Sequence, residues 1–81
     1  MKEPIIIIYA THWCGDCIRV RRFFRQNNIP FEWIDIDDCP EGERFVLETN
    51  HGMRSVPTIV FPDGSIQVEP SNLQLAVKLD L

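Results

Sequence analysis

The apolar run Ile5–Ala10 constrains the fold of this sequence more than any other segment. Pro4 bounds it on one side and the polar pair Thr11-His12 on the other. A short continuous apolar run between such boundaries is typical of a strand buried on both faces, which places helices on both sides of a sheet. The run is much shorter than the roughly 20 apolar residues of a membrane span, and its flanks lack the layout of a signal peptide. We therefore expect an α/β protein of the cytoplasm that does not enter membranes.

Helical and strand patterns alternate along the rest of the sequence. Apolar spacing and the residues that interrupt it predict helices near 15–27, 41–49 and from 71 onward, and further strands at 31–36, 58–61 and 65–69. The order is β-α-β-α-β-β-α, in which the first two strands are parallel and the last two form a hairpin. A length of 81 residues suits a single domain, residues 1–81. We expect a four-stranded mixed sheet flanked by helices.

Local signals also predict how two of the helices begin. Asp37-Asp38 offers an N-cap for the second helix, and Pro40 suits its first turn. The segment Ser71–Gln74 fits a capping box that opens the last helix. The residues of this helix that would face the core are Leu73, Ala76 and Val77.

The sequence holds three cysteines, an odd number that excludes a fully paired disulfide scaffold in a monomer. Cys14 and Cys17 form a Cys-x-x-Cys pair where the first strand passes into the first helix. Backbone N–H groups at a helix N-terminus stabilise negative charge, so this position favours the thiolate of Cys14. Cys17 shares the apolar helix face of Val20 and Phe24 and should be shielded. This placement predicts disulfide exchange, with Cys14 as the nucleophile and Cys17 as the resolving thiol.

Three segments together resemble the glutaredoxin family of the thioredoxin fold. They are Trp13-Cys14-Gly15-Asp16-Cys17, Ser55-Val56-Pro57-Thr58 and the turn Asp63-Gly64, within the same order of strands and helices. With Pro70-Ser71 before the last helix, the mycoredoxin-like subgroup is the most similar. The resemblance implies a thiol-disulfide oxidoreductase that reduces protein or mixed disulfides. It also implies that no cofactor is bound, because electrons come from glutathione, mycothiol or a thioredoxin reductase.

The same resemblance implies a groove for the substrate. It would be lined by Thr11, Trp13, Cys14, Val56, Pro57 and the start of the last helix, Ser71-Asn72. From their positions in the sequence we add Gly15, Asp16 and Arg54 as candidate substrate-binding residues. The Val56–Pro57 bond would be cis, although only about 5–6% of X-Pro bonds are cis in folded proteins. This bond would present backbone groups to an extended substrate, and Arg54 would contact the carboxylate of a small thiol.

Two positions depart from the glutaredoxin pattern. The last helix begins with the neutral pair Ser71-Asn72, where members that use glutathione place acidic groups for its α-amino group. Mycothiol, another small thiol or a thioredoxin reductase therefore remain alternative electron sources. The second departure is Asp16, because a carboxylate repels a nearby thiolate unless His12 and Arg19 offset its charge. We hypothesise that Asp16 lowers general reactivity and selects substrates with a basic residue beside the disulfide.

Two other functions fit the same pattern. A redoxin that donates electrons to ribonucleotide reductase is one, although its usual Trp-Ser-Gly-Phe-Arg segment is replaced here by residues 50–54. A non-catalytic metal- or protein-binding module is the other. A structural zinc site has about four ligands, and beyond the dithiol the chain offers only Cys39, His12 and His51. We predict no metal site and interpret Cys39 as a bystander.

The net charge of −4 argues against nucleic acid or anionic membranes as partners. Four arginines nevertheless crowd the predicted first helix: Arg19, Arg21, Arg22 and Arg25. We interpret them as a solvated face that steers anionic substrates. We expect this protein to be a monomer. Its expected partners are disulfide-containing proteins together with a small thiol or a reductase.

Overall fold

A computed structural model of the protein describes residues 5–81 and contains a four-stranded sheet in the order β2-β1-β3-β4. The strands are β1 (Ile6–Ala10), β2 (Phe31–Asp35), β3 (Thr58–Val60) and β4 (Ile66–Val68). β1 pairs in parallel with β2 and antiparallel with β3, and β3 pairs antiparallel with β4. The structure confirms the predicted mixed sheet, the parallel pairing of the first two strands and the antiparallel pairing of the last two. Each predicted strand differs from the observed one by a residue or two at its ends.

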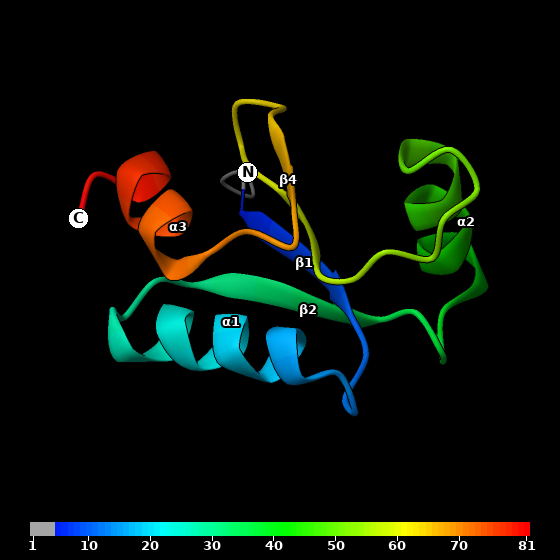
Figure 1. The fold of residues 1–81 in the computed structure, drawn as a ribbon, viewed down its shortest axis with the longest axis horizontal. Coiled ribbons are helices and arrows are strands. Elements are labelled where there is room, and N and C mark those ends of the chain that lie inside the picture. The colour runs from blue at the N-terminus through cyan, green and yellow to red at the C-terminus, as the bar shows by residue number, and fades with distance from the viewer. Residues whose placement is uncertain (1–4) are drawn as a thin grey trace.

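Three helices cover the sheet: α1 (Gly15–Gln26), α2 (Pro40–Thr49) and α3 (Asn72–Leu79). α1 and α3 pack with the β1 face of Ile6, Ile8 and Ala10, and together they form the main core. α2 lies apart from them, at the opposite end of the view from α3 (Figure 1). None of the helices in residues 5–81 has the length and apolar character needed to span a bilayer.

The burial of β1 differs between its two faces. Ile6, Ile8 and Ala10 are buried against α1 and α3, whereas Ile7 and Tyr9 on the other face are only half-buried. The reason is that α2 alone packs on this second face, where Phe45 stacks on the Tyr9 ring with the centroids 4.7 Å apart. The prediction of a strand buried on both faces is therefore correct for one face and only partly correct for the other.

The predicted orientation of α3 is wrong for Leu73 and Val77, whereas the third residue predicted to face the core, Ala76, is half-buried. The capping box is present, with the Ser71 hydroxyl accepting from the Gln74 N–H and the Gln74 side chain accepting from the Ser71 N–H. However, Leu73 and Val77 are each 74% exposed, whereas Leu75 is completely buried. Leu75 and Leu79 form a second apolar pair at i, i+4 spacing, and this pair packs on the core.

The predicted cap of α2 is also wrong. Cys39 is the N-cap, and it makes no side-chain capping hydrogen bond, while Pro40 is the first helical residue as expected. The Asp37 carboxylate turns away from the helix because it accepts hydrogen bonds from Trp13 and Arg54. Two strong donors from other loops thus compete successfully with the helix terminus for this carboxylate.

Candidate functional site

Cys14 lies where the sequence pattern placed it, at the junction of β1 and α1. It is the N-cap residue of α1, with extended backbone angles, and its Sγ accepts a hydrogen bond from the Cys17 N–H at 3.4 Å. Its side chain is half-buried, so the sulfur is reachable from solvent. A sulfur at this position receives a backbone donor and the positive end of the helix dipole, both of which stabilise negative charge.

Cys17 occupies the opposite kind of environment. It is 0% exposed and packs with Val20 and Phe24 in the core that α1 shares with the sheet. Burial raises the pKa of the Cys17 thiol to about 12, and the neighbouring Cys14 adds to this rise. Thr11, whose backbone N–H and hydroxyl favour the thiolate, partly opposes it. The two sulfurs of the pair therefore differ sharply in exposure and in surroundings.

The loop that precedes β3 lies beside Cys14. The Val56–Pro57 bond is cis, which confirms the prediction made from the resemblance. The Cys14 thiol donates to the Val56 carbonyl over 3.9 Å, and the Val56 side chain packs on the core next to Cys14. Pro57 itself is buried beneath the loop.

A set of hydrogen bonds from α2 holds this loop in place. The Thr58 hydroxyl donates to the Ser55 carbonyl at 2.7 Å. The Asn50 side-chain amide donates to the Thr58 hydroxyl at 3.2 Å and to the Val46 carbonyl at 2.9 Å. The predicted second helix ends just before Asn50. In the structure, Asn50 also holds the loop that lies beside Cys14.

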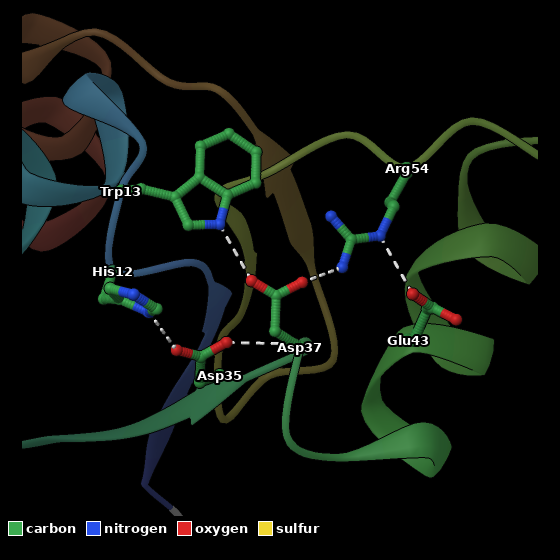
Figure 2. Close-up of polar contacts among 6 residues, drawn as sticks. All are labelled: His12, Trp13, Asp35, Asp37, Glu43 and Arg54. Atoms are coloured by element: carbon green, nitrogen blue, oxygen red, sulfur yellow. Dashed lines mark hydrogen bonds and ion pairs between the residues drawn. The ribbon is translucent and has the colours of Figure 1, made fainter.

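Asp37 connects three loops around the dithiol (Figure 2). Its carboxylate accepts a hydrogen bond from the Trp13 indole N–H at 2.8 Å and an ion-paired hydrogen bond from Arg54. Arg54 also donates through Nε to Glu43 on α2 at 2.9 Å. The Trp13 and Arg54 donors hold the pKa of Asp37 below its ordinary value, and Glu43 with Asp37 raises the pKa of Arg54. The guanidinium of Arg54 is thus already paired with two carboxylates, and its contact with a thiol carboxylate stays a prediction.

His12 forms a second link between the same loops. Its Nδ1 lies 3.0 Å from Asp35 Oδ2, and the Asp35 carboxylate also accepts from the Asp37 backbone N–H at 2.9 Å (Figure 2). The hydrogen bond to Asp35 raises the pKa of His12. Within the described part of the chain, His12, Asp35 and Asp37 are the one group of three potential metal ligands found close together, and the dithiol lies outside it.

Arg19 joins α1 to the start of α3. Its guanidinium donates to the Asn72 side chain at 2.7 Å and to the Pro70 carbonyl at 2.8 Å. It also lies 3.6 Å from the carboxylate of Asp16. Of the two cations expected to offset the charge of Asp16, Arg19 therefore contacts it, whereas His12 pairs with Asp35 instead.

The remaining predicted site residues fall into two groups. Gly15 and Asp16 are exposed in the first turn of α1, and Ser71 and Asn72 are exposed at the start of α3. Thr11 is completely buried and contributes to the surroundings of Cys17 rather than to the surface. The substrate contacts proposed for all these residues stay predictions.

Residues 6–66 match the family described as Glutaredoxin. The chain belongs to the glutaredoxin family. A protein of Mycobacterium tuberculosis that is named as a glutaredoxin is 38% identical over 79 residues, which cover 98% of this chain and 94% of the relative. Mycoredoxin 1 of Corynebacterium glutamicum is 29% identical over 75 residues, which cover 93% of this chain and 92% of the relative.

Solved structures show the same fold. The glutaredoxin of Archaeoglobus fulgidus superimposes with a TM-score of 0.76 at 22% identity, over 94% of this chain and 86% of that chain. The crystal structure of a mutant thioredoxin-like protein gives a TM-score of 0.79 at 27% identity, over 91% of this chain and 97% of that chain. The fold is thioredoxin-like, and membership of the glutaredoxins supports thiol-disulfide oxidoreductase chemistry in general.

The sequence reasoning missed Asp35, Asp37 and Glu43 as neighbours of the glutaredoxin dithiol. One signal was available for the first two. β1 and β2 are parallel, with Ala10 opposite Asp35, so the residues that follow both strands meet at the same edge of the sheet. His12 and Trp13 follow one strand and Asp37 follows the other, which is why their side chains pair. No sequence signal places Glu43 there, because its contact depends on how α2 packs.

Proposed function

We propose that this glutaredoxin reduces protein or mixed disulfides through a dithiol of Cys14 and Cys17. The supporting observation is the contrast between the two sulfurs: Cys14 is half-exposed and receives the Cys17 N–H, whereas Cys17 is completely buried. The exposed sulfur with a hydrogen-bond donor suits attack, and the buried sulfur with a raised pKa suits a later step.

In the first step, the Cys14 thiolate attacks one sulfur of the substrate disulfide. A bond forms between Cys14 Sγ and that sulfur while the substrate disulfide breaks, and the leaving thiolate takes a proton from solvent. The Val56 carbonyl lies beside the attacking sulfur and can accept from a backbone N–H of an extended substrate. The product is a mixed disulfide between Cys14 and the substrate.

In the second step, Cys17 loses its proton and attacks Cys14 Sγ. The Cys14–Cys17 disulfide forms, the substrate leaves as a thiol, and two electrons have passed to the substrate. Burial raises the pKa of Cys17 to about 12 even though Thr11 lowers it, so we expect this step to be slower than the first. Two molecules of a small external thiol, or a reductase, then return the pair to the dithiol form, and the external donor is oxidised.

We infer that mycothiol is a better electron source than glutathione. Glutaredoxins use glutathione or mycothiol as thiol donor, and one relative is named mycoredoxin 1. At the start of α3 this chain has the neutral pair Ser71-Asn72, and Asn72 accepts a hydrogen bond from Arg19, which also pairs with Asp16. The α-ammonium group of glutathione therefore finds no carboxylate in the Ser71-Asn72 pair, and the Asp16 carboxylate is already paired with a guanidinium.

A coupled reduction assay tests this proposal. Mycothiol, glutathione and thioredoxin reductase are compared as electron sources for one mixed-disulfide substrate, using wild type, Cys14→Ser, Cys17→Ser and, as the matched control, Cys39→Ser. We expect no activity in Cys14→Ser, full activity in Cys39→Ser and the highest rate with mycothiol. Loss of activity in Cys17→Ser indicates the dithiol route, and retained activity indicates that the external thiol resolves the mixed disulfide. Activity in Cys14→Ser would overturn the proposal.

A further inference from the structure

An open groove of about 450 Å³ runs along the outer surface of α1, the helix that carries both cysteines of the pair. Three arginines line it together with an apolar residue and an amide: Arg21, Arg22, Arg25, Ile18 and Gln26. The sequence pattern indicated only a solvated basic face here. The groove lies outside the hydrogen-bonded loops around Cys14.

By helical spacing, the groove lines up with the position of Cys14 at the start of α1. Ile18, Arg21 and Arg25 follow Cys14 by 4, 7 and 11 residues, and a helix of about 3.6 residues per turn brings these spacings to within roughly 40° of one line along its axis. The Ile18 N–H donates to the Cys14 carbonyl at 3.0 Å, so the helical register extends back to Cys14. With a rise of about 1.5 Å per residue, Arg21 and Arg25 lie roughly 10 and 16 Å along the axis from Cys14.

The arginines of the groove carry charge that the described chain does not neutralise. Within residues 5–81, the ion pairs involve His12, Arg19, Arg54 and Lys78, and none involves Arg21, Arg22 or Arg25. This concentration of positive charge occurs in a chain with a net charge of −4. An acidic ligand is therefore complementary to the groove and is repelled by much of the remaining surface.

Arg21 is fixed in position rather than free in solvent. Its guanidinium lies over the Trp33 ring, 4.6 Å from the ring centroid. Its Nε is buried and has no hydrogen-bond partner in the described part of the chain. Stacking on an aromatic ring restricts an arginine to few orientations, so less entropy is lost when it binds an anion. Ile18, which is 46% exposed, adds an apolar contact at the end of the groove nearer Cys14.

We propose that this groove binds an acidic segment of the protein whose disulfide Cys14 attacks. The inference rests on the proposed function and adds a rule for substrate choice. An extended chain rises about 3.3 Å per residue, so distances of roughly 10 to 16 Å place the acidic residues about three to five positions from the attacked cysteine. The partner is a protein rather than a nucleic acid, because a polyphosphate would also meet the carboxylates of Asp16, Asp35 and Asp37 beside the dithiol.

Two peptides of equal length test the rule. Both carry one cysteine blocked as a mixed disulfide, and they differ only in having glutamate or glutamine at positions three to five from it. We expect wild type to prefer the glutamate peptide about tenfold in kcat/KM at low ionic strength, and salt to reduce this preference. In the variant Arg22→Gln with Arg25→Gln the ratio should fall to about two or three, because Arg21 is kept for its packing on Trp33 and still contributes one positive charge to the groove.

Arg44→Gln serves as the control. It lies exposed on α2, outside the groove, so it removes the same kind of charge without touching the site, and the tenfold ratio should remain. Equal rates for the two peptides in wild type would overturn the proposed role of the groove while leaving the proposed function intact. An equal loss of preference in Arg44→Gln would also overturn it, because a general effect of charge would then be sufficient.

A binding measurement separates this inference from the proposed function. The variant Cys14→Ser with Cys17→Ser is titrated with the glutamate peptide carrying serine in place of its cysteine, and the backbone amide resonances are followed by NMR. We expect shifts concentrated at residues 18–26, whether or not the enzyme assay succeeds. Binding of an RNA oligonucleotide of equal charge with equal or higher affinity would overturn the choice of an acidic protein segment.

Discussion

The indole N–H of Trp13 donates to the Asp37 carboxylate at 2.8 Å, and the two residues are 24 positions apart in the chain. Trp13 immediately precedes Cys14, and Asp37 lies in the loop between β2 and α2. Through Arg54, the same carboxylate reaches the loop that precedes the cis-proline. The carboxylate of Asp37 therefore connects the three loops that surround Cys14 through hydrogen bonds.

Replacement of Asp37 by alanine should loosen these loops. Trp13 and Arg54 would lose the carboxylate that accepts from both of them. We expect the indole N–H of Trp13 to exchange with solvent several-fold faster and kcat/KM to fall about three- to tenfold, because Cys14 is held less firmly. NMR hydrogen exchange and the reduction assay measure the two effects.

Asp38→Ala is the matched control for that experiment. Asp38 is the exposed neighbour of Asp37, and its carboxylate makes none of the hydrogen bonds found among residues 5–81. It should leave both the indole exchange rate and kcat/KM unchanged. An Asp37→Ala protein with the exchange rate of wild type would show that the Trp13 contact does not restrain the loop.

The pair of His12 and Asp35 predicts a dependence on pH in the neutral range. The hydrogen bond to Asp35 raises the pKa of His12 above its ordinary value of 6.5. The pair therefore contributes its full stabilisation below pH 6.5 and loses it as the pH rises through the pKa of the folded protein. An NMR titration of the His12 ring should give a lower pKa in Asp35→Asn than in wild type. Identical titration curves would contradict the ion pair.

The stabilisation that Asp37 contributes depends on pH in the opposite direction. Trp13 and Arg54 lower the pKa of Asp37 below its ordinary value of 3.8. Its stabilisation is present above pH 3.8 and is lost as the pH falls through the pKa of the folded protein. Arg54→Gln removes one of the two donors, so a carboxyl titration followed by NMR should show the pKa of Asp37 rising toward 3.8. If that pKa stays where it is in wild type, the contact with Arg54 contributes nothing to it.

Thr11 should control the second step of catalysis. Its hydroxyl oxygen is buried and has no hydrogen-bond partner in residues 5–81. The Thr11 N–H and hydroxyl both act to lower the pKa of Cys17. Thr11→Val keeps the shape but removes the hydroxyl, so the pKa of Cys17 should rise further. We expect release of the substrate from the Cys14 mixed disulfide to slow about tenfold, while its formation is unchanged.

Rapid-quench measurement of the two steps separates this effect from a general loss of structure. Thr11→Ser retains the hydroxyl and should restore the release rate. Global stability should change little in Thr11→Val, because a buried hydroxyl is replaced by a methyl group of similar size. A release rate equal to that of wild type in Thr11→Val would assign no catalytic effect to this hydroxyl.

The parts of the structure that depend on local chemistry could be predicted from the sequence. The order of elements follows from apolar periodicity, and the position of Cys14 follows from its place between an apolar run and a helical pattern. The cis bond at Pro57 was expected only through the family resemblance, since local sequence gives it little weight. The parallel pairing of β1 and β2 places Asp37 near Trp13, but its choice of Trp13 and Arg54 over the start of its own helix depends on tertiary packing.

The orientation of α3 was ambiguous for a related reason. Its sequence contains two apolar pairs at i, i+4 spacing, Leu73 with Val77 and Leu75 with Leu79. Either pair can form the buried stripe of an eight-residue helix, and periodicity alone does not choose between them. In the structure Pro70, which precedes α3, and Leu75 are both completely buried, so tertiary packing selects the Leu75 side of the helix.

A pair of alanine substitutions tests that orientation. Leu75→Ala removes a completely buried side chain from the main core and should lower the free energy of unfolding by about 2–5 kcal/mol. Leu73→Ala makes the same chemical change in the same helix at a position that is 74% exposed, and it should alter the free energy by no more than about 0.5 kcal/mol. Urea unfolding followed by circular dichroism measures both. Equal losses would mean that both leucines contact the core in solution, whereas a larger loss for Leu73→Ala would reverse the orientation of α3 described above.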